Sequence, residues 1–293
     1  MPNYATYAKL ALVSLIWGGT FVAGRYLSAD VPPLLSACLR FLLASMTLII
    51  FISIKNNLII ELSKSQTLRL ITLGFFGVFL YNVFFFYGLH YTDASRASLI
   101  VALNPALIAL TAFFIEKEKI SRTNLIGIMA CVVGAITVIL SKSTISHSSS
   151  ELWKVDLLIF GCVISWVIYT VFAKKIVLEI GPIHTVTYSV IAGTSMLFMA
   201  LIFQGGDTIS ALTLITQKQI LSLVYLGVIG SAIAYILYYD GIQSIGATKA
   251  GGFIALNPLS AVILSFLILG ENLSISMLLG GIIAITGIYF CNK

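Results

Sequence analysis

Two stretches of sequence decide the fold: VALNPALIAL at residues 101–110 and IALNPLSAVI at residues 254–263. Each places an asparagine and a proline, Asn104-Pro105 and Asn257-Pro258, inside an apolar run. A proline removes one backbone hydrogen bond and interrupts a helix, and an asparagine amide is costly in apolar surroundings unless it is hydrogen-bonded. Because the same costly pair recurs 153 positions later, we interpret it as one feature of a repeated unit.

The composition predicts a membrane protein. Of the 293 residues, 59% are hydrophobic and only 10% are charged, whereas soluble domains carry about 25% charged residues. The apolar residues extend over the whole length, which predicts an all-α integral membrane protein and not a soluble domain with one anchor. The formal net charge of +6 comes from basic residues in short connections, so it indicates membrane topology and no nucleic-acid partner.

Ten segments are long and apolar enough to cross a bilayer, which takes about 20 residues as a helix. Transmembrane strands would alternate over about 10 residues, whereas these segments are apolar on every side. The ten expected transmembrane helices cover residues 6–27, 33–54, 68–89, 93–115, 122–141, 153–173, 182–203, 219–242, 246–269 and 274–291.

The basic residues predict how these helices are oriented. If the N-terminus lies inside, eleven Lys and Arg residues fall on the inner side and five on the outer side. Cytoplasmic connections carry the excess of positive charge in membrane proteins. Both termini are therefore expected in the cytoplasm.

The second half of the chain repeats the first. Residues 73–138 align without a gap on residues 226–291, with 17 identities in 66 positions, and at a shift of 149 Trp17 aligns with Trp166. We therefore predict a first five-helix repeat at 1–141, an extracytoplasmic linker at 142–152 and a second repeat at 153–293.

An odd number of helices gives the second repeat the opposite orientation in the membrane. The expected fold is thus ten transmembrane helices arranged as two inverted five-helix repeats. Many secondary transporters have this architecture, with the substrate site between the halves near the membrane midplane. A duplication with a purely structural role is the alternative.

Further motifs give the chain a family resemblance. They are LIWGGTFVAGRYL at 15–27, PPLLSACLRFLLA at 32–44 and EKEKIS at 116–121 in the first half, and ISWVIYTVFAKKI at 164–176 and ALNPLSAVILSFLILGE at 255–271 in the second. Over essentially the whole chain, the sequence resembles the EamA-type transporters of the drug/metabolite transporter superfamily. None of these motifs is specific for a substrate.

The resemblance implies a ten-helix bundle in the cytoplasmic (inner) membrane of a bacterium. Members of the family move small organic metabolites, often amino acids and often outward. The resemblance also implies that helices 1, 3, 4, 6, 8 and 9 line a central cavity, while helices 5 and 10 lie behind them.

Polar and aromatic residues inside the expected helices are the candidate substrate-binding residues. Broken helices are tolerated at membrane depth where they are buried in protein or line a wet cavity, so Asn104 and Asn257 are candidates, with Pro105 and Pro258 as hinges. Rings can stack on a partly apolar substrate, while hydroxyls and amides orient it. The remaining candidates are Trp17, Tyr81, Asn82, Trp166, Tyr169 and Tyr235. For all of them, packing or hydrogen bonding between helices is the alternative interpretation.

Of the charged residues, only Arg40 and Asp240 are expected to lie inside the membrane and away from the connections, and such charges are functional candidates. Asp240 and His90 are the candidates for proton coupling, since both can titrate. Arg40 is expected to reach the outer interface or a helix end. Glu118 and Glu271 follow two helix ends and are expected to cap the helices that begin next.

The sequence lacks the motifs of the common enzyme classes. It contains no GxxxxGK[ST], HExxH, CxxC or GxSxG, so neither ATP hydrolysis nor a metal or cofactor is expected.

The predicted partners are a small-molecule substrate, the lipid bilayer and protons as a candidate coupling ion; the sequence does not decide between monomer and dimer. We expect a secondary transporter that moves a small organic metabolite, such as an amino acid or a related amphiphile, outward by alternating access. The alternatives are an uptake or exchange carrier for a larger metabolite and a membrane-embedded enzyme.

Overall fold

The computed structural model describes residues 4–55, 59–116, 121–140, 152–205, 208–246, 250–251, 253–254 and 256–291. These residues form helices joined by short turns, and no strand occurs among them, which confirms the all-α prediction. Glu118 and nearly all of the expected linker at 142–152 lie outside the described residues.

The helices of the first half lie close to their expected positions. They are α1 (Tyr4–Ser28), α2 (Pro33–Lys55), α3 (Lys64–Leu73), the π-helix η1 (Gly74–Leu80), α4 (Tyr81–Tyr91), α5 (Ala94–Val101), α6 (Asn104–Glu116) and α7 (Arg122–Ile139).

The second half follows the same order. Its helices are α8 (Leu152–Ile180), α9 (Pro182–Gln204), α10 (Thr208–Thr213), α11 (Gln217–Val224), the π-helix η2 (Tyr225–Ile233), α12 (Ala234–Ile245), α14 (Leu256–Leu264), the π-helix η3 (Ser265–Leu269) and α15 (Ile275–Cys291). The short helix α10 was not expected from the sequence.

The surface is suited to lipid. Seven helical runs of the described residues are long and apolar enough to cross a membrane, and three shorter apolar helices, at 122–138, 256–269 and 275–287, occupy further expected positions. Large side chains such as Ile54, Phe114 and Phe203 are 79%, 71% and 87% exposed, an arrangement that is stable when the surroundings are apolar. The count of ten spans stays a prediction, since three of these segments are shorter than a full crossing.

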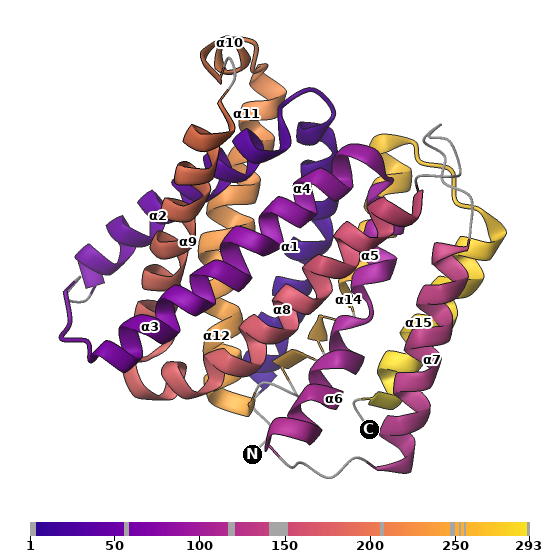
Figure 1. Cartoon of the computed structure of the whole chain (residues 1–293). Coiled ribbons are helices and arrows are strands. Elements are labelled where there is room, and N and C mark those ends of the chain that lie inside the picture. The colour runs from indigo at the N-terminus through magenta and orange to yellow at the C-terminus, as the bar shows by residue number, and fades with distance from the viewer. Residues whose placement is uncertain are drawn as a thin grey trace.

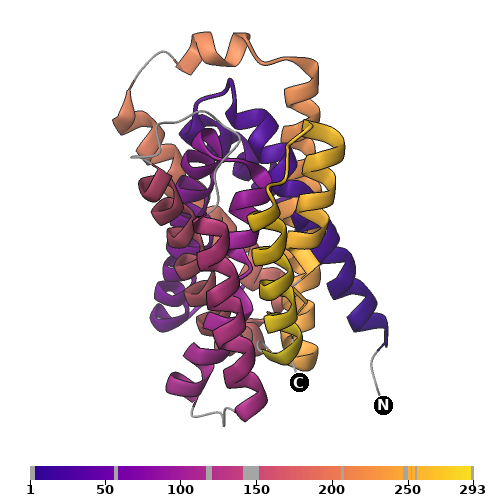
Figure 2. The same cartoon turned by 90° about the vertical axis from the view of Figure 1, so that its right-hand side faces the viewer.

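The two halves run in opposite directions (Figure 1). We call the face where α1 begins and α15 ends the terminal face, and the face with the α4–α5 turn the far face. The run α3–η1–α4 passes from the terminal face to the far face, whereas its counterpart α11–η2–α12 passes back. Figure 2 shows α7 and α15 side by side, with α10 lying across the far face.

Glycines from the two halves meet in matched pairs. A Cβ on Gly134 would lie 2.5 Å from the backbone nitrogen of Ala284, and one on Gly287, its counterpart at a shift of 153, would lie 2.5 Å from that of Cys131. Cys131 and Ala284 are themselves counterparts at the same shift. Helices α7 and α15 therefore pack backbone to backbone about a pseudo-twofold axis, because small residues allow close approach.

Both Asn-Pro motifs break a helix. Helix α5 ends at Val101 and α6 begins at Asn104, while in the second half α14 begins at Leu256. The Ile254 carbonyl, which Pro258 cannot bond, instead accepts the N–H of Asn257 at 2.9 Å.

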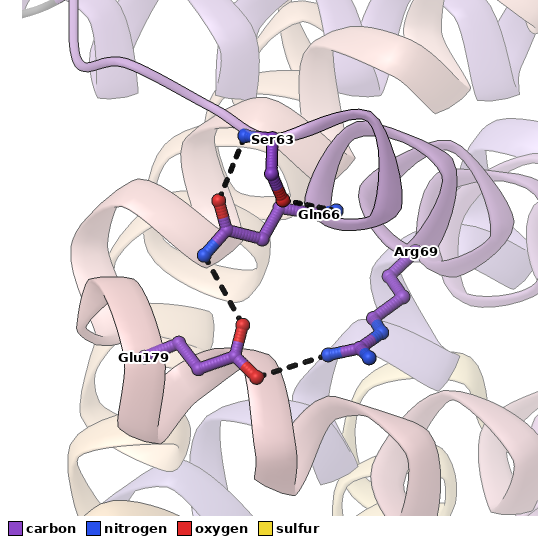
Figure 3. A network of polar contacts seen from close by, with 4 residues as sticks. All are labelled: Ser63, Gln66, Arg69 and Glu179. Atoms are coloured by element: carbon purple, nitrogen blue, oxygen red, sulfur yellow. Dashed lines mark hydrogen bonds and ion pairs between the residues drawn. The ribbon is translucent and has the colours of Figure 1, made fainter.

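A polar network at the terminal face fixes the start of α3 (Figure 3). Ser63 Oγ accepts the Gln66 N–H at 3.2 Å, and Gln66 Oε1 accepts the Ser63 N–H at 3.0 Å, so the helix begins with a capping box. Gln66 Nε2 and Arg69 Nη1 also donate to Glu179 of α8, at 3.1 and 3.0 Å. The network therefore joins the two halves.

Candidate functional site

A small cavity lies where α1, α2, α4, α5, α6, α8, α12 and α14 meet. Its volume is about 20 Å³, enough for one ordered water molecule. An organic substrate can occupy it only after the lining side chains move apart. The lining residues are Trp17, Thr20, Phe21, Arg40, Tyr81, Val101, Asn104, Trp166, Tyr235, Ile254 and Asn257.

The structure brings together six of the eight residues predicted to bind substrate. Trp17, Tyr81, Asn104, Trp166, Tyr235 and Asn257 all line the cavity. Their helices are those that the resemblance implies, and α2 joins them through Arg40.

The two asparagines of the Asn-Pro motifs offer unused hydrogen-bonding capacity. Asn104 is 1% exposed and Asn257 is 4% exposed. The Oδ1 atom of each is buried without a hydrogen-bond partner among the described residues. A buried polar atom of this kind is costly, so it suggests a ligand-binding role.

The aromatic side chains form one cluster around the cavity. The rings of Trp17 and Trp166 meet edge to face at 5.1 Å, and Tyr235 lies 5.9 and 5.7 Å from them. Trp17 Nε1 donates to the carbonyl of Gly230 in η2 at 2.9 Å, which provides the partner that a buried indole requires. The cluster gives the cavity a rigid, largely apolar wall.

The other two predicted binding residues lie behind the cavity wall. Asn82 is fully buried; its Nδ2 donates to the Val78 carbonyl at 2.8 Å and its Oδ1 accepts from Arg40. Tyr169 packs against Trp166 at 5.3 Å and directs its hydroxyl toward Ser189. Neither residue lines the cavity, so each can act on a substrate only through a neighbour.

The predicted hinges adjoin the cavity. Pro105 and Pro258 are buried, and Val101 and Ile254, each four residues before its proline, contribute to the lining. The two helix breaks therefore lie beside the cavity in both halves. Bending at either proline would change the shape of the cavity.

Arg40 is the lining residue whose role the sequence reasoning missed. It was expected to reach an interface or a helix end, but its side chain is 2% exposed and lines the cavity. Its Nε donates to Ser231 Oγ at 2.9 Å and its Nη1 to Asn82 Oδ1 at 3.1 Å. The signal that could have identified this role is the position of Arg40 within an expected transmembrane helix, where a charge is a functional candidate.

The two candidates for proton coupling lie at the rims of the bundle. Asp240 pairs with Lys9 at 3.1 Å, and the two side chains are 38% and 48% exposed. His90 directs Nδ1 to the Ser28 carbonyl at the far face. Neither residue lines the cavity.

Two expectations about charges are wrong. The count of charges inside the bundle missed Arg96 and Asp156, which form a buried bidentate ion pair at 2.9 and 2.8 Å. Glu271 does not cap the following helix: its carboxylate accepts from the backbone N–H groups of Ala94 and Ser95 at 2.8 and 3.0 Å, at the start of α5. A carboxylate at a helix N-terminus is stabilised by the helix dipole, and here that helix belongs to the other half.

Comparison with known proteins agrees with this architecture. The profile of the EamA-like transporter family matches residues 6–140 and 153–293. The chain belongs to this family, and the protein is a multi-pass membrane transporter.

The relatives of this chain are also described as transporters, but their names give no substrate. The chain is 27% identical over 288 residues to the uncharacterized transporter YyaM of Bacillus subtilis (98% of this chain, 93% of the relative). It is 29% identical over 288 residues to an uncharacterized transporter of Archaeoglobus fulgidus (98% and 97%). A solved crystal structure with 18% identity has the same fold, with a TM-score of 0.72 over 96% of this chain and 94% of the other.

Proposed function

We propose that this protein is a secondary transporter that moves a small organic metabolite, an amino acid or a related amphiphile, outward across the cytoplasmic membrane. Movement occurs by alternating access, in which the two halves rock about the central cavity while Pro105 and Pro258 bend. No covalent step is required of the protein, so the proposed function is not enzymatic.

The observation that carries this proposal is the cavity between the inverted halves. It is lined by counterparts from both repeats, Trp17 with Trp166 and Asn104 with Asn257. Transporters built from inverted repeats bind their substrate at such an interface. The buried amide oxygens supply polar contacts and the rings supply an apolar wall, a combination that suits a small amphiphile.

Counterflow in proteoliposomes tests transport. Purified protein should exchange an internal unlabelled metabolite for its labelled form with saturable kinetics. Absence of flux across amino acids, amines, sugars and nucleosides would reject the proposal. Vesicles of defined orientation, with both termini mapped by protease access, test the outward direction and the cytoplasmic termini.

The asparagines are tested within the same assay. Asn104→Ala and Asn257→Ala, in folded protein, should raise KM or lower turnover, because each removes a polar group of the cavity wall. Unchanged kinetics in both variants would remove the asparagines from the site.

Protons are the proposed coupling ion, with Asp240 and His90 as the groups that carry them. Both lie at the rims, so they would act by making or breaking contacts there and not by touching the substrate. Asp240→Asn or His90→Gln should abolish accumulation driven by a pH gradient while counterflow persists. Accumulation that is unchanged in both variants would reject the role.

A further inference from the structure

Arg40 and Arg96 are both buried arginines, but within the described part of the chain only Arg96 has an opposite charge beside it. Arg96 forms its bidentate ion pair with Asp156. The described partners of Arg40 are neutral: Ser231 Oγ, Asn82 Oδ1 and the rings of Phe41 and Phe85, whose centroids lie 5.2 and 5.5 Å from Cζ. Among the described residues, no carboxylate oxygen lies within 4.0 Å of its guanidinium nitrogens.

An arginine in this position is costly to maintain. Removing a guanidinium from water is unfavourable, and neutral acceptors and aromatic rings offset that cost only in part. Intramembrane charges without a structural partner typically mark the path of a substrate or ion. The Arg40 side chain is also part of the cavity lining, so a substrate in the cavity could reach it.

The repeat shows that this charge has no counterpart in the other half. At the shift of 149 that aligns Trp17 with Trp166, Arg40 aligns with Ser189. The lining pairs Trp17/Trp166 and Asn104/Asn257 keep the same residue in both halves. A single positive charge on one side gives the cavity a polarity, which would fix the direction in which a polar substrate binds.

We infer that the transported metabolite carries a carboxylate and that Arg40 binds it; this inference rests on the proposed transport function. The guanidinium uses Nε–H and one N–H of Nη1 for Ser231 and Asn82, which leaves Nη2 and the second hydrogen of Nη1 to donate. Arginine matches a carboxylate with paired hydrogen bonds. Asn82 and Ser231 are positioning residues that hold the guanidinium in place.

The asparagines complete the recognition of an amino acid. Their unpartnered Oδ1 atoms accept hydrogen bonds, and the amino group of an amino acid donates them. Arg40 thus selects for the charge that distinguishes an amino acid from an amine.

Matched probes test this assignment in full-length protein reconstituted in proteoliposomes. The probes are leucine, phenylalanine and serine, each beside its amide and its decarboxylated amine. Counterflow of each acid should exceed that of its two analogues in the wild-type protein. Arg40→Gln, which keeps hydrogen-bonding capacity without the charge, should raise the KM for the acids by about 10-fold to 100-fold, as expected for the loss of a charge-assisted bidentate contact.

A second measurement separates recognition from a structural role. If Arg40 only stabilised the fold, Arg40→Gln would lower the melting temperature of the unliganded protein. If it binds the carboxylate, the melting temperature should stay the same or rise, since an uncompensated buried charge is removed, while stabilisation of the protein by leucine is lost. Arg69→Gln, at the exposed rim, is the control and should leave the KM for the acids unchanged.

The possible failures are distinct. If the wild-type protein moves the amides or amines as well as the acids, or if Arg40→Gln moves the acids with unchanged KM, the carboxylate assignment is overturned while transport stands. If no metabolite in the broader panel moves, the transport function fails, and the assignment fails with it.

Discussion

Among the described residues, the ion pair that joins the two halves at the far face is buried, whereas the ion pairs that join them at the terminal face are exposed. The Arg96 and Asp156 side chains are 1% and 8% exposed, and Glu271 is 9% exposed against the start of α5. At the terminal face, the side chains of the pairs Lys9–Asp240 and Arg69–Glu179 are between 31% and 48% exposed. Each of these contacts links a residue of the first half to one of the second.

The difference matters because alternating access must break the contacts at one rim while those at the other hold. Separating a buried ion pair leaves charges in a low dielectric and is strongly unfavourable, whereas exposed pairs contribute little because water replaces them. The far face is therefore the more firmly closed of the two rims, and we expect the unloaded protein to open more readily at the terminal face.

The largest effect is expected from Asp156→Asn. Asp156→Asn removes one charge of a buried ion pair, which should lower the free energy of unfolding by about 3–5 kcal/mol. Denaturant unfolding in detergent micelles measures the change. The double substitution Arg96→Met with Asp156→Leu should recover much of the stability. An Asp156→Asn protein as stable as the wild type would show that this pair does not fasten the far face.

A smaller effect is expected from Glu271→Gln. The carboxylate accepts the N–H groups of Ala94 and Ser95 and the Ser95 hydroxyl, and hydrogen bonds to a charged group contribute about 1.5–3 kcal/mol. Neutralising it should weaken the far rim and increase the reaction of a cysteine placed at Thr92, which is buried in the α4–α5 turn, with an impermeant maleimide. The exposed neighbour Asn272, changed to Ala, is the matched control. Equal labelling in both variants would argue against Glu271 as a closing contact.

These contacts also show how far sequence reasoning extends. Hydropathy predicted most of the helices to within a few residues, because every span must satisfy its own backbone in lipid. Helix α8 runs on to Ile180, and the first part of the expected helix at 246–269 lies largely outside the described residues. The Asn-Pro motifs predicted the helix breaks, and the repeat placed their counterparts together in the lining.

Long-range partners could not be predicted in this way. Sequence position suggests that Glu271 caps the helix that follows it, but there the Ser274 hydroxyl accepts the Met277 N–H. The Glu271 carboxylate instead accepts the N–H of Ala94 at the start of α5, a residue 177 positions earlier in the chain. Arg96 and Asp156 are at the ends of their helices, so sequence position suggested connections near water. Only packing of the halves shows that these ends are buried.

At the terminal face, Asp240→Asn should have a small effect. Exposed ion pairs contribute about 0–1 kcal/mol, so the free energy of unfolding should change by no more than that. A double-mutant cycle with Lys9→Ala measures the coupling between the two side chains directly. A coupling energy as large as that of Arg96 with Asp156 would remove the difference between the rims.

The smallest effect is expected for Glu179→Gln in the network of Figure 3. Gln66 and Arg69 donate to Glu179 near water, and screening by salt weakens exposed pairs further. The unfolding midpoint should therefore match the wild type within error, and raising the salt concentration should shift both proteins equally. Glu179→Gln should also leave maleimide labelling at Thr92→Cys unchanged, because that position belongs to the opposite rim. A clear loss of stability at low salt, absent at high salt, would instead show that exposed contacts fasten the terminal face, and the two rims would then differ in screening and not in strength.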